Sequence, residues 1–265
     1  MAPHLCSLEF TGINLSPLEV KVLSSGLQSN TVLTSFSLKR VNLTDAGADY
    51  LLPALASTQI SLLALSHVGL TDKSRANIAH LVKTHCWKRD ELTWAISLRC
   101  KKGVCPSAKT APGEIPTSGI LTLDLSSNQL GDDTASALSH ALVHDGWLLG
   151  IDLSRNRIGM KGATALCELL VQNAYVAAVK MDSNPCFLKP KGREGMGMMQ
   201  QILAARETAL GAPFPAPRPT HLPPSSLPAS LSSILSALSI ASTFPSPSAR
   251  ASSQTALKIA VTPDS

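Results

Sequence analysis

Aromatic residues and charged residues are both scarce in this chain of 265 residues. Phe, Tyr and Trp together make up 4% of the sequence, and Asp, Glu, Lys and Arg make up 15%, whereas 44% of the residues are hydrophobic. Disordered chains have the opposite balance, because they are rich in charge and poor in apolar residues. The composition therefore predicts a packed domain whose core consists of aliphatic side chains rather than a few large aromatic ones.

Long apolar runs are absent as well. No stretch reaches the roughly 20 apolar residues that a helix needs to cross a bilayer. The N-terminal segment has no basic region followed by an apolar run, which is the pattern of a secretory signal. We expect a protein of the cytoplasm that does not enter the membrane.

Features of an enzyme or a metal site are also missing. The six cysteines show no zinc-binding spacing, and we expect them to be buried reduced thiols. His140 and His144 are spaced as two metal ligands on a helix could be, but no third ligand follows, so ordinary exposed side chains are the preferred interpretation. The chain contains neither a phosphate-binding glycine loop nor a nucleophile motif. We expect no enzyme activity, no cofactor, no metal and no small-molecule substrate.

The basic residues do not suggest a nucleic-acid partner. The net charge of +5 is mild for this length, and the excess lies in short patches. A nucleic-acid-binding protein concentrates Lys and Arg on one face. We therefore expect other proteins, and not nucleic acid, as partners.

A repeat of about 28 residues organises the first two thirds of the chain. The stretch LTLDLSSNQL at 121–130 returns as LGIDLSRNRI at 149–158, and both match the leucine-rich-repeat signature. Six copies can be aligned, and every step between their first apolar positions except one has about this length. The exceptional step, from Ile60 to Ile120, is roughly twice as long, so it holds one repeat and an insertion of similar size. The first positions are Leu5, Leu33, Ile60, Ile120, Leu148 and Val176.

Each position of the repeat has a predicted structural role. The first, fourth and sixth residues are expected to point inward from a short strand, as Ile120, Leu123 and Leu125 do in the fourth copy. The ninth residue is an asparagine in the last three copies, where its amide can satisfy backbone groups of the turn after the strand. These asparagines are Asn128, Asn156 and Asn184.

The second half of each copy has the features of a helix. Ser16-Pro17-Leu18-Glu19 has the form of a capping box with proline at the first helical position. A strand and a full helix within one such repeat resemble the ribonuclease-inhibitor class. We expect an α/β leucine-rich-repeat solenoid of about six repeats over residues 1–186, with parallel strands inside and helices outside. The later helices are expected near 44–55, 71–84, 132–143 and 160–172.

The inner face of such a solenoid is the expected partner-binding surface, because it offers a wide area on a stiff frame. The polar side chains on its strands either recognise a partner or are simply solvated, and the sequence leaves both readings open. The candidates are Glu9, Lys39, Asp124, Asp152, Lys180 and Asp182.

Residues 87–119 interrupt the repeat. The first half of this insertion has helical spacing, with Leu92, Ile96 and Arg99 near one face, and the second half is rich in Pro and Gly. Trp94 is either an aromatic anchor for a partner or a plug in the groove between the repeats that the insertion separates. We favour the plug, because an inserted segment must pack against something. Trp94 and Arg99 are the candidate contact residues of the insertion.

The insertion resembles a segment of a known family. The string RDELTWAISLR at 89–99 is similar to a segment of the 78-kilodalton centrosomal protein family, where it also lies between leucine-rich repeats. Similarity extends over roughly residues 31–186, including DGWLLGIDL at 145–153. The resemblance implies a scaffold of the centrosome, centriole and basal body in cilium or flagellum formation, with centriolar or basal-body proteins as partners. That family has more sequence before its repeats and a coiled coil after them, so a short or incomplete member is expected.

Two other functions stay open. A leucine-rich-repeat regulator of a small GTPase would be expected to carry an acidic tail, whereas Asp264 is the one acidic residue after Glu207. A generic cytosolic repeat adaptor would need nothing beyond the solenoid.

The end of the chain has a different composition. Residues 187–210 are expected to hold a capping helix, at 194–210, over the open end of the solenoid. Residues 211–265 are rich in Pro, Ser and Ala and are expected to be a disordered tail.

Overall fold

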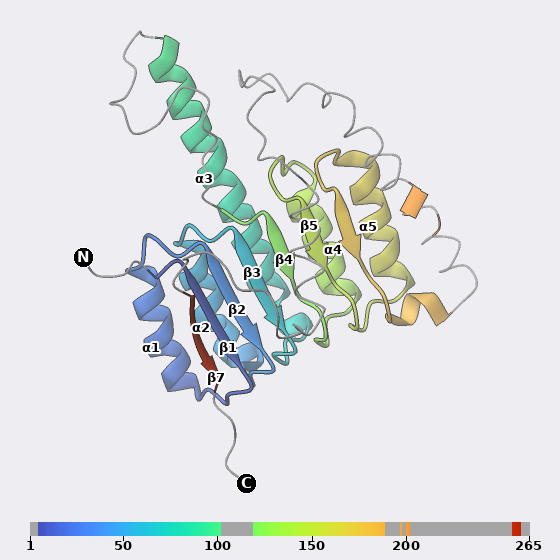
Figure 1. Ribbon diagram of the computed structural model, residues 1–265. Helices are drawn as coiled ribbons and strands as arrows, with labels where there is room; N and C mark the ends of the chain where they lie inside the picture. Colours follow the sequence, from blue (N-terminus) through green and yellow to red (C-terminus); the bar gives the residue numbers. More distant parts are fainter. Residues whose placement is uncertain (1–4, 102–118, 189–196, 198–199, 202–255, 261–265) are drawn as a thin grey trace, which may run out of the picture.

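The computed structural model describes residues 5–101, 119–188, 197, 200–201 and 256–260, and for 96–101 and 256–260 it describes the backbone alone. Short strands alternate with helices along these residues (Figure 1). The strands are β1 (Ser7–Thr11), β2 (Ser35–Lys39), β3 (Leu62–Ser66), β4 (Thr122–Asp124), β5 (Gly150–Asp152), β6 (Ala178–Lys180) and β7 (Ala256–Ala260). The helices are α1 (Pro17–Gln28), α2 (Thr44–Ala56), α3 (Arg75–Lys101), α4 (Asp132–Leu142) and α5 (Met160–Gln172), with short 3-10 turns η1 (Asp72–Ser74) and η2 (Pro185–Leu188).

The described strands form one parallel sheet in the order β6-β5-β4-β3-β2-β1-β7. Strands β1 to β6 pair in the order in which they occur in the chain, so each strand–helix unit lies beside the next. Parallel neighbours need a crossover connection, and the intervening helix supplies it. The helices stack on one side of the sheet, and none of the described helices lies on the other side, which we call the open side (Figure 1). The predicted α/β solenoid of strand–helix repeats is confirmed.

The repeated apolar positions form a continuous core. In the fourth repeat Ile120, Leu123 and Leu125 are buried, as the repeat predicted. The corresponding residues of the other repeats belong to the same cluster, which runs from Leu8 to Cys186, except that Leu5 and Phe10 of the first repeat are partly buried and pack against it. A single unit exposes one apolar face, and stacking removes it from water, so the stability of the solenoid comes mainly from contacts between neighbouring repeats.

Helix α1 begins as the sequence predicts. The backbone N–H of Ser16 donates to Glu19 Oε2 at 2.7 Å, and the N–H of Glu19 donates to Ser16 Oγ at 3.3 Å. Pro17 occupies the first turn. The hydrogen bond from the Ser16 backbone holds the pKa of Glu19 below its ordinary value. The capping box is confirmed.

After each of the strands β1 to β6 the chain turns through a residue with positive φ. Gly12 has this conformation in the first repeat, with φ of 71°. A side chain in the left-handed region costs about 1–2 kcal/mol, and the later repeats nevertheless place one there. These residues are Arg40, His67, Ser127, Arg155 and Ser183, with φ between 53° and 61°.

Asn128 shows how this turn is held. Its Nδ2 donates to the carbonyls of Leu65 at 2.7 Å and Leu125 at 3.0 Å. Its Oδ1 accepts from the backbone N–H groups of Val68 at 3.1 Å and Leu70 at 3.2 Å. Both of the amide's polar atoms are therefore used, and they bind the turn of its own repeat to that of the preceding one.

Asn156 and Asn184 repeat this arrangement. Asn156 Oδ1 accepts from Leu130 N at 3.1 Å, and Asn184 Oδ1 accepts from Ile158 N at 3.0 Å. The predicted role of the ninth-position asparagines is confirmed. In the second and third repeats the same position holds Val41 and Val68, which are buried.

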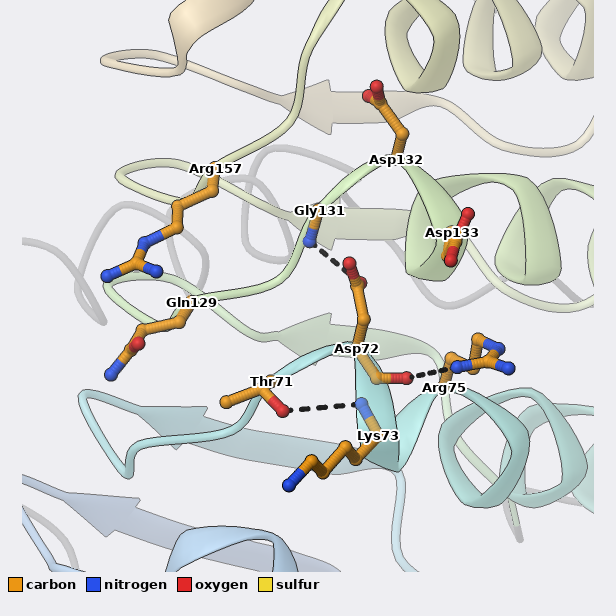
Figure 2. A pocket seen from close by; sticks show the side chains of 9 residues that line it. All are labelled: Thr71, Asp72, Lys73, Arg75, Gln129, Gly131, Asp132, Asp133 and Arg157. Atoms are coloured by element: carbon orange, nitrogen blue, oxygen red, sulfur yellow. Dashed lines mark hydrogen bonds between the residues drawn. The ribbon is translucent and has the colours of Figure 1, made fainter.

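A second set of hydrogen bonds, accepted by aspartate side chains, links the starts of successive helices. We call it the aspartate ladder, and the repeat pattern does not predict it. Asp72 Oδ1 accepts a hydrogen bond from the backbone of Gly131 at 2.8 Å (Figure 2). It also accepts from the backbone and the hydroxyl of Thr134, at 3.1 and 2.5 Å. A carboxylate of one repeat thus caps the helix of the next. The other members are Asp45, which binds the N–H of Thr71, and Asp132, which binds those of Gly159 and Gly162.

Replacing Asp72 by alanine is expected to lower the free energy of unfolding by about 1–2 kcal/mol, because two backbone N–H groups at the start of α4 lose their acceptor. Urea unfolding followed by circular dichroism measures the change. The control is Asp133→Ala, which removes an exposed carboxylate from the same helix start and should change stability by less than about 0.5 kcal/mol. Equal losses in the two variants would contradict the capping role.

Helix α3 differs from the prediction for this region. The sequence analysis ended a helix near Thr84 and began the insertion at Trp87, but α3 runs unbroken from Arg75 to Lys101. The segment contains neither Gly nor Pro, so nothing stops the helix. Its 27 residues span about 40 Å, whereas the 13 residues of α2 span about 20 Å. The insertion therefore begins as an extension of a repeat helix, which projects beyond its neighbours (Figure 1).

The expectation of an unstructured tail over 211–265 is wrong for five of its residues. Ala256–Ala260 form β7, which pairs in parallel with β1, with Ser7 opposite Ala256. Because β1 would otherwise present unpaired backbone groups at the edge of the sheet, an added strand satisfies them. The predicted capping helix at 194–210 lies outside the described residues, apart from Gly197, Gln200 and Gln201.

Candidate protein-binding surfaces

The strand register aligns most of the predicted inner-face residues across the sheet. One residue of each strand from β1 to β6 falls in a single row on the open side. The row is Glu9, Ser37, Ala64, Asp124, Asp152 and Lys180. Four of the six inner-face candidates therefore lie in one line, and Lys39 and Asp182 follow two residues after members of that line.

The two ends of this row carry accessible charge. Glu9 and Lys39 form an ion pair at 3.0 Å, and their side chains are 26% and 30% exposed. A pair this exposed is worth at most about 1 kcal/mol, so a partner can replace it at little cost. At the other end Lys180 is half-buried and Asp182 is exposed.

Asp124 and Asp152, in the middle of the row, are 4% and 3% exposed. Each accepts a hydrogen bond from the backbone two residues later, at 2.8 Å from Ser126 and 2.9 Å from Ser154. Burial raises the pKa of Asp124, and the charge of Asp152 on the next strand adds to the shift. These carboxylates end their strands and are not the accessible contact groups that the sequence suggested.

Small side chains dominate the open side between the charged ends. In the row that starts at Ser7, every partner on β2 to β6 except Leu62 is small. These partners are Ser35, Leu62, Thr122, Gly150 and Ala178. Short side chains let a partner come close to the sheet.

The extended part of α3 buries polar side chains. His85 is 3% exposed, Arg89 1% and Thr93 3%. The Arg89 guanidinium donates a hydrogen bond to the carbonyl of Gly119, where the chain returns from the insertion, and lies 5.5 Å from the centre of the Trp147 ring. Arg89 therefore ties α3 both to the end of the insertion and to the loop before β5.

Asp90 and Asp145 complete this contact. Trp147 Nε1 donates to Asp90 Oδ1 at 2.8 Å, and the backbone N–H groups of Trp147 and Leu148 donate to Asp145 Oδ1 at 2.7 and 3.0 Å. Burial lowers the pKa of Arg89 to about 10, and the nearby Asp145 charge opposes that shift. Burial raises the pKa of Asp145. The cluster places a buried cation near a buried carboxylate.

Trp94 does not fill the groove between repeats, so the preferred interpretation of this residue is wrong. Its side chain is 63% exposed, and Trp87, one heptad earlier, is 67% exposed. Arg89 takes the buried place instead, because its long side chain reaches Gly119 and Trp147. Arg99 lies where the structure describes the backbone of α3 alone.

The turn edge of the sheet holds a polar hollow between the start of η1 and the start of α4 (Figure 2). It is lined by Thr71, Asp72, Lys73, Arg75, Gln129, Gly131, Asp132, Asp133 and Arg157. Its two central carboxylates, Asp72 and Asp132, already accept backbone N–H groups of the following repeat. The capping hydrogen bonds therefore account for both of these carboxylates.

The described residues offer little reactive chemistry. Among them, no three His, Cys, Asp or Glu side chains lie so as to share a metal ion. Burial raises the pKa of the Cys86 thiol to about 12 and that of Cys186 to about 11, so neither is a ready thiolate. Among the described residues, Cys6, Cys86, Cys167 and Cys186 form no disulfide. No helix in the described part of the chain combines the length and the apolar character required to cross a membrane.

The similarity to known proteins includes the repeats whose buried strand residues and turn asparagines are described above. The family model described as "Leucine Rich repeat" matches residues 120–139 and 147–167, which contain β4, β5 and their turns. The chain thus contains leucine-rich repeats and is similar to the centrosomal protein of 78 kDa. The Mus musculus relative is 29% identical over 147 residues, which are 54% of this chain and 17% of the relative. The Homo sapiens relative is also 29% identical over 147 residues, 54% of this chain and 20% of the relative.

The match therefore involves a fifth or less of the curated relatives' length. Among solved structures, this leucine-rich-repeat chain is similar to leiomodin-1 actin-binding site 2, with a TM-score of 0.44, 13% identity, and coverage of 79% of this chain and 85% of that one. The tropomodulin C-terminal domain of Caenorhabditis elegans gives a TM-score of 0.43 at 10% identity, covering 79% and 89% of the two chains.

Arg89, Trp147 and the capping aspartates were not among the residues selected from the sequence. Arg89 lies inside the quoted insertion motif, but a buried arginine is rare and its partners are distant in sequence. The aspartates had a visible signal, since Asp45, Asp72 and Asp132 each stand at the start of a helix.

Proposed function

We propose that this chain is a non-enzymatic protein-binding scaffold that acts in the cytoplasm, on the cytoskeleton, at the centrosome or basal body during cilium or flagellum assembly. The observation that carries the proposal is the 29% identity over 147 residues to the centrosomal protein of 78 kDa. Its partners are other proteins, with centriolar or basal-body components as the expected class, rather than nucleic acid, membrane or a small-molecule substrate.

The shape of the sheet supports a binding role. Its open side is wide, stiff and lined with small residues, with Glu9 and Lys39 at one end and Lys180 and Asp182 at the other. We assign these four residues to the partner contact. A partner that bridges the two ends would bind both charged groups at once and gain from their fixed separation.

The finer architecture belongs to the same proposal. A full helix in each of the units α1, α2, α4 and α5 supports the ribonuclease-inhibitor class, with about six repeats over 1–186. We place the end of the repeat region at the η2 turn, near Cys186.

The test is the location of a tagged full-length chain beside a centriole marker in ciliating cells. Accumulation at centrioles or basal bodies is the expected result. The matched control is Leu123→Ser, which places a hydroxyl in the buried core and should abolish the accumulation together with the fold. A diffuse signal from the intact, folded chain would overturn the centrosomal assignment.

A further inference from the structure

The distal half of α3 has its amphipathic pattern reversed. Toward the protein it presents His85, Arg89 and Thr93, all buried, whereas Trp87 and Trp94 are 67% and 63% exposed. Residues three, four and seven apart share a helix face. An indole buries more area than almost any other side chain, so leaving two of them in water while burying an arginine works against the folding of this chain alone. The reversal points to a function for the outward face.

The outward face is a continuous stripe. Residues 80, 83, 87, 91 and 94 follow one another in steps of three and four, which keeps them on one side of the helix. Two heptad-spaced indoles stand about 10 Å apart along the axis, with Glu91 between them. Lys83 Nζ lies 5.6 Å from the centre of the Trp87 ring and helps to fix that indole. We call this face, His80, Lys83, Trp87, Glu91 and Trp94, the α3 stripe.

The position of α3 makes this face accessible. The helix is about twice as long as α2 and α4, and its last turns pass beyond the neighbouring helices (Figure 1). Arg89, with Trp147 and Gly119 as partners, fixes the orientation of the extension from the opposite side. The indoles are thus held on a rigid rod before any partner arrives, which lowers the entropy cost of binding.

We propose that the α3 stripe docks an amphipathic helix of another protein, with apolar side chains that meet Trp87 and Trp94 and a Lys or Arg between them that pairs with Glu91. This rests on the proposed protein-binding function but names a surface on the helical side, away from the open side of the sheet. Heptad-spaced anchors are the way in which helices recognise helices. Exposed tryptophans at such positions are common hot spots.

Charge selects this occupant over the alternatives. In a symmetric antiparallel pair of two copies, each Trp87 would meet a Trp94, but Glu91, near the midpoint, would face Glu91 of the other copy and repel it. An anionic nucleic acid or lipid surface would meet the same carboxylate. A basic residue at the centre of an apolar helix turns this charge into an attraction.

The experiment starts from a displayed library of helical peptides of about 20 residues, which is long enough to span both indoles. Peptides that bind the full chain are selected from it. Peptides that also bind the Trp87→Ser, Trp94→Ser double variant are removed. Enriched peptides are expected to carry apolar residues at helical spacing around a Lys or Arg. Their affinity, measured by fluorescence anisotropy, should fall at least about tenfold for Glu91→Lys and recover when the basic residue of the peptide is changed to Glu.

The matched control is Leu92→Ser. Leu92 is 45% exposed on the same helix but lies outside the α3 stripe, so its loss should leave peptide affinity unchanged. The proposal is overturned if no peptide distinguishes the chain from the double variant, if the enriched peptides lack a basic residue or ignore Glu91→Lys, or if sedimentation shows a dimer that the double variant abolishes. Peptide selection does not depend on where the protein lies in the cell. A negative result in the peptide experiment can therefore be distinguished from a negative result in the centriole experiment.

Discussion

Replacing Asn128 by alanine is expected to lower the free energy of unfolding by about 3 kcal/mol. The side chain is buried, it donates to the carbonyls of Leu65 and Leu125, and it accepts from the N–H groups of Val68 and Leu70. Alanine has no group that can satisfy these four buried backbone atoms. Denaturant unfolding monitored by circular dichroism gives the change.

Asn128→Asp separates hydrogen bonding from packing. The carboxylate has nearly the volume of the amide and can accept from Val68 and Leu70, but it cannot donate to Leu65 and Leu125. It is expected to cost at least as much as alanine, because it also buries a charge opposite two carbonyl oxygens. Gln129→Ala, at the neighbouring exposed position, is the control. A small loss for aspartate beside a large loss for alanine would show that packing, not the amide donors, holds the turn.

The second large effect is expected at Arg89. Replacing it by methionine keeps most of its apolar length but should cost about 3 kcal/mol, because the Gly119 carbonyl loses a donor and the buried Asp145 loses a nearby cation. The same change at Arg75, which is exposed on the same helix, should cost less than about 0.5 kcal/mol.

A double-mutant cycle isolates the charge. In the next repeat Asn173 occupies the position of Asp145 and makes the same backbone contacts. Its Oδ1 accepts hydrogen bonds from the N–H groups of Tyr175 and Val176. Asp145→Asn should therefore fit, and in the Arg89→Met background it should recover at least about 1 kcal/mol. Strictly additive losses in the two single variants would show that the charges of Arg89 and Asp145 do not stabilise one another.

The repeat itself could be predicted because its signal is local and occurs several times. Leu123 and Ile151 stand at the same place in successive copies, and Asn128 and Asn156 follow each at the same distance. Because successive copies agree in their spacing, their alignment is certain. The strands, the buried positions and the turn asparagines could therefore all be predicted from it. The burial of Asp124 had a weaker local signal in its spacing from Ser126, which is that of a carboxylate bound to the backbone two residues on.

The site could be predicted only in part, because its contacts depend on distant residues. That Arg89 is buried depends on Gly119 and Trp147, which stand far along the chain, and no periodicity connects them. The exposure of Trp94 depends on the same distant contacts. They turn the Arg89 face of α3 toward the protein and leave Trp94 on the opposite face. The pairing of Ala256–Ala260 with β1 joins residues far apart in the sequence. The alternation in Leu257-Lys258-Ile259 fits a strand, but it does not indicate which strand this segment pairs with.

The aspartate ladder has a consequence for how the chain folds as it is synthesised. Each carboxylate lies N-terminal to the groups that it binds, so it is already in place when the helix start of the next repeat is synthesised. The repeats can therefore assemble one after another from the N-terminus during synthesis. The contact from Asp45 to Thr71 spans 26 residues, and that from Asp72 to Gly131 spans 59, because the insertion lies between them. Loop-closure cost rises by only about 0.6 kcal/mol for each doubling of length. The solenoid can therefore carry an insertion such as the extension of α3 at small cost, provided that Asp72 binds Gly131 and restores the register of the repeats that follow.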